Sequence, residues 1–295
     1  MIRRNFLDLS TAERETFAAA FNHVNSTGLI DTHAVTHENY FYSGIHWRSQ
    51  FLPWHRYFLR KLELALQEFD GSVMLPYWNW TRSDSDDIDV NAWESIFGGR
   101  DNIGGKFDSG WSYLRNGDGD GWNLPSLSHV VAELSAATFA EYRKVEGANG
   151  SRMGSHVHAH VWVGGTMSVG DSPRDPLFYL HHCNIDRLWA IWQINNAGKS
   201  QYDDTTVIES DARAPLAPYV GADEEMPEVT TPWQNQPGFS GATPNQMLNH
   251  RELGFFEPVG GYGYGRDSAL EVEWEQAHGN TLITDIPPTL VIAGL

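Results

Sequence analysis

The chain has 295 residues, 41% of them hydrophobic and 12 of them tryptophan, which is enough to build one large domain or two small ones. A formal net charge of −18 argues against nucleic acids and anionic membranes as partners, and no apolar run reaches the roughly 18 residues of a transmembrane helix. We expect no secretory signal, because polar sequence follows the first residues, and the single cysteine excludes an internal disulfide.

The predicted elements are mostly helices joined by long irregular segments. A capping box at Ser10 and Glu13 begins the first helix, and Pro53 opens a long amphipathic one. Residues 74–80 are expected to be extended, 81–123 and 197–240 to be loops, and the tail to hold short strand-like runs. The predicted helices span about 11–25, 31–40, 53–69, 125–146, 155–163, 175–195 and 243–253.

The helix predicted at 175–195 is the central element of the sequence. Asp175 can cap its N-terminus, and Pro176 suits the first helical position. Its own apolar residues occupy nearly every face of the helix, as is typical of a buried helix. The polar residues within it therefore need partners, because unpaired burial is costly. These residues are His181, His182, Asp186 and Arg187.

A second segment has the same layout as the start of this helix. Residues 51–60 align with 178–187 without gaps, which places His55 over His182 and Arg60 over Arg187. The match suggests two equivalent helices that each contribute one histidine to a shared site, and it favours His182 over His181.

Most of the 13 histidines fall into two clusters, one before residue 56 and one after residue 155. Single buried histidines are more often core residues than ligands, and no HExxH zinc-protease motif is present. Three imidazoles for each metal suit copper, with zinc as the chemical competitor, and a pair of such sites favours redox work over hydrolysis. The first cluster holds His33, His37, His46 and His55, and the second holds His156, His158, His160, His181 and His182.

Four motifs carry a resemblance to a known family, and it runs from about residue 2 to 257. The chain resembles the type 3 copper proteins, which are tyrosinases, catechol oxidases and haemocyanins, and it is most similar to the short bacterial tyrosinases. The motifs are residues 51–56 (FLPWHR), 75–80 (LPYWNW), 156–165 (HVHAHVWVGG) and 175–187 (DPLFYLHHCNIDR).

The resemblance implies a mainly α fold, with a four-helix bundle that holds a dicopper centre. It implies one tyrosinase-like domain over 1–257, with 258–295 as an extension packed on it. The cofactors would be two copper ions, with dioxygen as co-substrate. The implied ligands are His37, His46 and His55 for the first copper, and His156, His160 and His182 for the second.

Four further positions bear on this centre, and the resemblance singles out all of them except Asp186. Glu146 lies near the position at which the family has a glutamate that orients a water by the second copper. Asp186, one turn after His182, could accept the Nδ1 proton of a ligand imidazole or form an ion pair with Arg187 or Arg60. Val157 stands where efficient monophenol hydroxylases often have asparagine. Gly44 replaces a cysteine that forms a thioether bridge in some members. The expected activity is oxidation of phenols, o-diphenols or o-aminophenols to o-quinones, with o-diphenols favoured.

Two other functions and one partner stay open from the sequence. A haemocyanin-like oxygen carrier would use the same ligands, although the residues after 257 are too few for a typical second domain that blocks the site. A zinc hydrolase is the third interpretation. The resemblance also implies a companion protein that delivers copper, and either a cytoplasmic location or export together with that partner.

Overall fold

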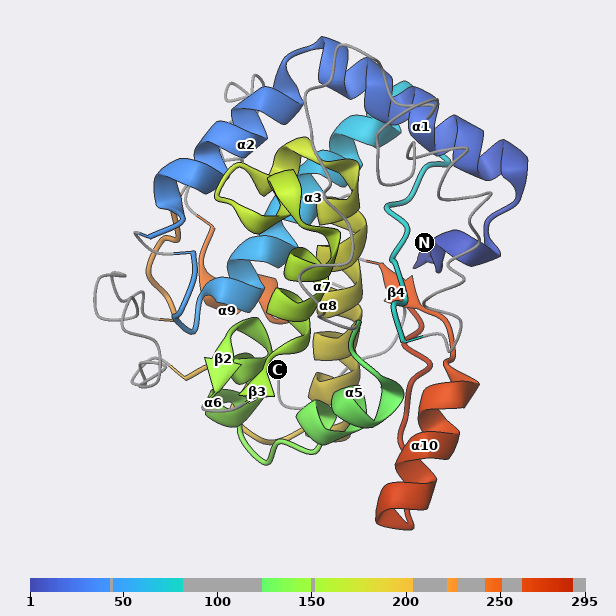
Figure 1. The fold of residues 1–295 in the computed structure, drawn as a ribbon, viewed down its shortest axis with the longest axis vertical. Helices are drawn as coiled ribbons and strands as arrows, with labels where there is room; N and C mark the ends of the chain where they lie inside the picture. Colours follow the sequence, from blue (N-terminus) through green and yellow to red (C-terminus); the bar gives the residue numbers. More distant parts are fainter. Residues whose placement is uncertain are drawn as a thin grey trace.

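The computed structural model describes residues 1–42, 45–81, 124–149, 152–203, 222–227, 242–250 and 262–288. The two long central helices, α3 (Phe51–Phe69) and α8 (Pro176–Asn195), run in opposite directions (Figure 1). They pack against each other and form the core. Helices α1 (Thr11–Ser26) and α2 (Leu29–Tyr40) cover one end, with α1 against α3. Helix α7 (Ser155–Val163) packs on α8, and together these helices give the expected bundle.

Helix α8 begins as its sequence predicts. The Asp175 carboxylate accepts a hydrogen bond from the backbone N–H of Leu177 at 2.9 Å, and Pro176 is the first helical residue. All residues from Pro176 to Gln193 are buried. Helix α3 begins at Phe51, two residues before the predicted start, so Pro53 lies in the first turn, where its missing N–H is not needed.

The single helix predicted at 125–146 is wrong. The segment forms α5 (Leu127–Leu134), the short α6 (Phe139–Tyr142) and a 3₁₀ turn, η4 (Arg143–Glu146). Thr138 and Glu141 form a second capping box, which starts a new helix inside the predicted one. After η4, the hairpin β2 (Ala148–Asn149) and β3 (Arg152–Met153) leads into α7. Gly154 lies so close to Val145 that a Cβ there would overlap its backbone.

The tail also differs from prediction. Helix α9 (Pro244–Met247) is only four residues long, and its predicted extension to 253 runs partly outside the described residues. A helix that the sequence did not suggest, α10 (Ser268–His278), is capped by Asp267, ends at Gly279 and packs on α5. Strand β4 (Gly263–Tyr264) pairs in parallel with β1 (Ile2–Arg3), so the two ends of the described chain lie side by side.

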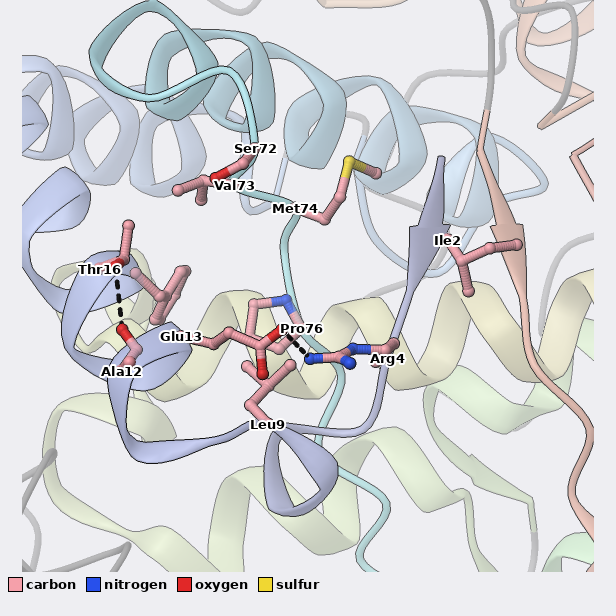
Figure 2. Close-up of a pocket in the computed structure, with 11 residues that line it drawn as sticks. Ile2, Arg4, Leu9, Ala12, Glu13, Thr16, Ser72, Val73, Met74 and Pro76 are labelled. Carbon is pink, nitrogen blue, oxygen red and sulfur yellow. Dashed lines mark hydrogen bonds and ion pairs between the residues drawn. The ribbon is translucent and has the colours of Figure 1, made fainter.

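The N-terminal segment encloses a cavity of about 260 Å³ together with α1 and residues 72–76 (Figure 2). Arg4 and Glu13 meet there in an exposed ion pair of 2.5 Å. No histidine lines this cavity, so it is separate from the histidine clusters. In the described part of the chain, no helix combines the length and apolar character needed to span a bilayer. Most residues of the loops predicted at 81–123 and 197–240 lie outside the described residues, and the described parts of these loops, 81, 197–203 and 222–227, contain no helix or strand.

Candidate metal centre

The fold brings three histidines of the first cluster and four of the second to the middle of the bundle. Helix α2 supplies His37, the segment before α3 supplies His46, and α3 supplies His55; the three ligand atoms lie within 4.8 Å of one another. A second group with the same spacing comes from α7 and α8. It consists of His156, His160, His181 and His182.

The two groups face each other where α3, which carries His55, packs against α8, which carries His182. The rings of His55 and His182 are stacked, with centroids 4.4 Å apart and planes inclined by 9°. Phe178 packs on His182 at 4.1 Å, and Phe51 packs on His55 at 4.6 Å. The short internal match therefore corresponds to two equivalent helices that bring one histidine each to a shared centre.

Backbone carbonyls set the tautomers of four of these rings. A carbonyl can only accept a hydrogen bond, so each Nδ1 beside one carries the proton and each Nε2 keeps its lone pair. Such an acceptor also holds the ring in a fixed orientation. The pairs are His37 with Gly170 at 2.5 Å, His55 with Phe51 at 2.8 Å, His156 with Glu146 at 2.8 Å, and His160 with Met167 at 2.5 Å.

The free nitrogens point at one another, and this arrangement fits a bound cation. Nε2 of His37 lies 3.4 Å from Nε2 of His55, and Nε2 of His160 lies 3.1 Å from Nε2 of His182. Burial lowers the pKa of His37 to about 3 and that of His160 to about 4, so these rings are neutral at pH 7. Facing lone pairs repel unless a cation lies between them, and neutral nitrogen donors without thiolate or carboxylate suit copper.

His181 belongs to the second group by distance, but its hydrogen bonds exclude it as a ligand. Its Nδ1 accepts a hydrogen bond from the Trp80 indole N–H at 3.0 Å, so the proton of the neutral ring is on Nε2. That N–H donates to the backbone carbonyl of His156 at 3.1 Å. Both nitrogens of His181 are therefore occupied, whereas Nε2 of His182 faces Nε2 of His160. His33, which is buried against Phe58, lies outside both groups.

A cavity of about 190 Å³ opens onto both groups. His37 and His46 line it from the first group, and His156 and His160 line it from the second. The rest of its wall is mainly apolar and comes from α7 and from segments near 41–47 and 146–172; Phe41, Trp47, Val157, Val161, Met167 and Val169 are part of it. The cavity also contains Glu146, so two of the three predicted non-ligand residues lie beside the imidazoles.

Asp186, the third of those residues, has different partners from the predicted ones. Its carboxylate accepts hydrogen bonds from Arg56 at 2.5 Å and from Arg3 at 3.2 Å. Tyr262 and Tyr264 donate to it at 2.5 and 2.6 Å. The prediction that Asp186 accepts the Nδ1 proton of a ligand imidazole is therefore wrong, because its carboxylate is bound by arginine and tyrosine side chains instead. The alternative of an ion pair with Arg60 or Arg187 is also wrong, because these pair with Glu63 and Asp267, and Asp186 pairs with Arg56 and Arg3 instead.

The sequence reasoning missed several residues that shape the centre. Trp80, Trp47 and Arg56 contact the histidines or their neighbours, yet each has the appearance of an ordinary core residue in the sequence. The available signals were the motifs at 51–56 and 75–80, which contain Arg56 and Trp80, and the position of Trp47 directly after His46.

The comparisons with known proteins agree with this geometry. The family model "Common central domain of tyrosinase" matches residues 26–124 and 120–195. The tyrosinase of Streptomyces antibioticus is 31% identical over 84% of this chain and 96% of its own.

Two solved structures share the fold. A polyphenol oxidase mutant from Thermothelomyces thermophila has a TM-score of 0.59 at 18% identity, over 85% of this chain and 86% of its own. Deoxygenated haemocyanin from Rapana thomasiana has a TM-score of 0.62 at 19% identity, over 95% of this chain and 74% of its own. Because the family model covers more than half of the residues, the chain belongs to the tyrosinase family of type 3 copper proteins, whose centre holds two copper ions.

Proposed function

We propose that this protein is a copper-dependent phenol oxidase that converts o-diphenols to o-quinones with dioxygen. Two o-diphenols lose two electrons and two protons each, and one dioxygen is reduced to two waters. The first copper would be held by His37, His46 and His55. The second copper would be held by His156, His160 and His182. When bound, the copper pair supplies the transfer of electrons between the diphenol and dioxygen.

One observation carries the proposal. Two groups of buried, neutral imidazoles face each other across the stacked rings of His55 and His182, and both open into the same apolar cavity. The cavity's size suits one substituted aromatic ring, and its apolar wall excludes water from the imidazoles. The carbonyl of Gly170 holds the His37 ring, and that of Met167 holds the His160 ring, so the donors need little rearrangement to bind metal.

The substrate preference rests on the two residues beside the second group. A monophenol must lose its hydroxyl proton before it is oxidised, and that step needs a positioned acceptor. Val157 has no polar atom with which to hold a water, and Glu146 already accepts a hydrogen bond from Trp47. We therefore place o-diphenols, and by the same reasoning o-aminophenols, ahead of monophenols as substrates.

An oxygen carrier is the second candidate, because the fold is shared with haemocyanin. A carrier keeps substrate away from its metals. None of the tail residues 262–288 lines the cavity between the histidine groups; they pack near β1 and α5 instead. In the described part of the chain, the cavity is thus not covered by the tail, which favours an oxidase.

A companion protein and a location complete the proposal. The ligands are nearly all buried, so copper needs a path to them, and a partner that delivers it would supply one. Cys183, the single cysteine, is buried and free, so the chain needs no disulfide-forming compartment. We place it in the cytoplasm or outside the cell after export with that partner. Because nearly all the ligands are buried, copper salts alone should load the metal-free protein slowly, and rapid loading would argue against the companion.

The test combines copper analysis with oxygen uptake. Purified protein reconstituted with copper is expected to bind two ions per chain and to consume one dioxygen for every two molecules of catechol oxidised. Zinc-loaded protein is the control and should consume no oxygen. Reversible oxygen binding without quinone formation would support the carrier, and failure to bind two coppers would reject the proposed function.

A further inference from the structure

Trp47 has an unusual backbone conformation. Its φ is 58°, and among the described residues it is the one non-glycine residue with positive φ. A bulky residue rarely occupies this left-handed region, because its Cβ crowds the backbone. Such strain persists only where the surrounding structure imposes it, and it is concentrated at functional sites. Trp47 directly follows His46 in the chain and lines the cavity described above.

The Glu146 carboxylate holds this conformation. Its Oε1 accepts a hydrogen bond from the Trp47 backbone N–H at 2.5 Å, and both residues are buried. The Trp47 ring stacks on Tyr42 at 5.6 Å and meets Phe41 edge-on at 5.4 Å. The hydrogen bond gives an acceptor to a buried backbone N–H, which would be costly to leave without one. It can therefore offset the steric cost of the left-handed backbone.

The orientation of the His46 ring depends on the backbone more than the orientations of the His37 and His55 rings do. His37 and His55 donate from Nδ1 to the carbonyls of Gly170 and Phe51, which orient their rings. Nδ1 of His46 is buried and has no hydrogen-bond partner within the described residues. The direction of the His46 ring is therefore set by packing and by the backbone of residues 46 and 47.

Glu146 also contacts the other group. Its backbone carbonyl accepts the Nδ1 proton of His156 at 2.8 Å, while its side chain reaches the segment of His46. The rings of His46 and His156 lie 6.0 Å apart across the centre. One residue thus connects the two groups, through its main chain on one side and its side chain on the other.

We propose that Glu146 is a positioning residue that aims His46 at the first copper by holding Trp47 in its left-handed conformation. The inference rests on the proposed dicopper function. Loss of the carboxylate releases Trp47 toward the ordinary backbone regions and turns His46 away from His37 and His55. The carbonyl that holds His156 is unaffected by a side-chain substitution. Copper binding at the first site should therefore be weakened, while binding at the second site is kept.

The experiment measures copper bound per chain after dialysis against a copper chelator. Glu146→Ala is expected to retain one copper of two, with at least about tenfold weaker binding at the first site. Glu146→Gln keeps an acceptor oxygen and should retain two. Glu68→Ala, which removes an exposed carboxylate from α3, is the matched control and should retain two coppers.

A second substitution tests the route through Trp47. Glycine adopts positive φ without steric cost. Trp47→Gly in the Glu146→Ala background is therefore expected to restore the second equivalent of copper, although the aromatic wall of the cavity is lost. A purely structural role for Glu146 would not give this rescue.

The outcomes separate this inference from the proposed function. If the unaltered protein binds two coppers and Glu146→Ala also retains both with unchanged affinity, the positioning role is rejected while the function stands. Loss of both ions from Glu146→Ala without rescue by Trp47→Gly also rejects it. If the unaltered protein does not bind copper, the proposed function itself fails.

Discussion

The second nitrogen of each imidazole decides what that histidine can do. Nδ1 of His55 is hydrogen-bonded to a backbone carbonyl, so the lone pair of its Nε2 is available to bind a metal. Both nitrogens of His181 are hydrogen-bonded, so neither is available. Adjacent residues of the same type, His181 and His182, therefore have different chemistry. This difference depends on Trp80, which lies about a hundred residues earlier in the chain.

Replacing these two neighbours should give opposite results. His182→Gln is expected to reduce the bound copper from two ions to one, because it removes a donor of the second site. His181→Gln should keep both ions and lower the free energy of unfolding by about 1–3 kcal/mol, through its broken hydrogen bonds to Trp80 and His156. Copper analysis and urea unfolding measure the two effects. Loss of a copper from His181→Gln alone would reverse the assignment.

The residue after His156 should set the balance between monophenols and diphenols. Val157→Asn places an amide in the cavity beside Glu146, where it can hold a water that accepts the phenol proton. We expect the ratio of monophenol to diphenol rates to rise about tenfold or more, within the usual range for general-base assistance. The measurement compares initial rates on tyrosine and its catechol.

Val161→Asn is the matched control for this change. It adds the same amide to the same cavity, but after His160 instead of His156. The ratio should stay near that of the unaltered protein. An equal rise in both variants would mean that polarity alone, and not the position beside His156, decides the preference.

At the scale of elements, the buried pair of Arg56 and Asp186 joins the two central helices. Arg56 follows His55 on α3, and Asp186 lies one turn after His182 on α8, so the pair spans the helices that carry the stacked rings. Arg56 also donates to the carbonyls of Met247 and Leu248. The role left for Asp186 is therefore to hold α3 and α8 together.

Breaking this pair should destabilise the protein strongly. Asp186→Ala leaves Arg56 buried without its carboxylate, which costs about 3–5 kcal/mol of unfolding free energy in comparable cases. Urea unfolding at pH 7 measures the loss. The exposed pair of Arg4 and Glu13 provides the control, since Arg4→Ala should change the stability by less than about 1 kcal/mol.

The same pair gives a stability that depends on pH. Burial alone would raise the pKa of Asp186, but Arg56 and Arg3 hold it below its ordinary value of 3.8. The native carboxylate thus binds its proton less readily than the unfolded one, so its contribution is present above about pH 4 and is lost as the pH falls further. The loss of stability in acid should be shallower in Asp186→Ala. An unchanged slope would contradict this account of the pair.

At the scale of the whole molecule, we propose that residues 1–257 form the dicopper domain and 258–295 an extension packed on it. The described part of the tail supports this division but also shows close attachment. Strand β4 pairs with β1, and Tyr262 and Tyr264 donate to Asp186 in the core. The Arg3 guanidinium lies over the Tyr262 ring at 3.4 Å.

Because of this attachment, the chain should unfold as one unit. Metal-free protein is expected to show a single transition in urea, with the same midpoint by tryptophan fluorescence and by far-ultraviolet circular dichroism. Tyr264→Phe removes one hydrogen bond to Asp186 and should shift both midpoints together. Two separate transitions would mean that the extension folds independently of the dicopper domain.

The sequence by itself determined what is local. Capping residues and Pro176 gave the start of α8, and the clustering of histidines along the chain gave two groups of candidates, from which the family resemblance selected the ligands. Local signals also misled. The pattern over 125–146 suggested a single helix, but Thr138 caps a second helix within it. The cap at Asp267 begins α10, a helix that the sequence pattern did not suggest.

The tertiary structure decided everything that depends on contacts between distant segments. It showed that Asp186 pairs with Arg56 and Arg3 rather than with an imidazole. It also showed that the Trp80 indole N–H donates to Nδ1 of His181, and that the Glu146 carboxylate accepts from the Trp47 backbone N–H. The physical reason is that hydrogen-bond partners of buried polar groups are chosen by the packing of the whole chain, whereas caps, turns and helix faces are set by residues a few positions apart.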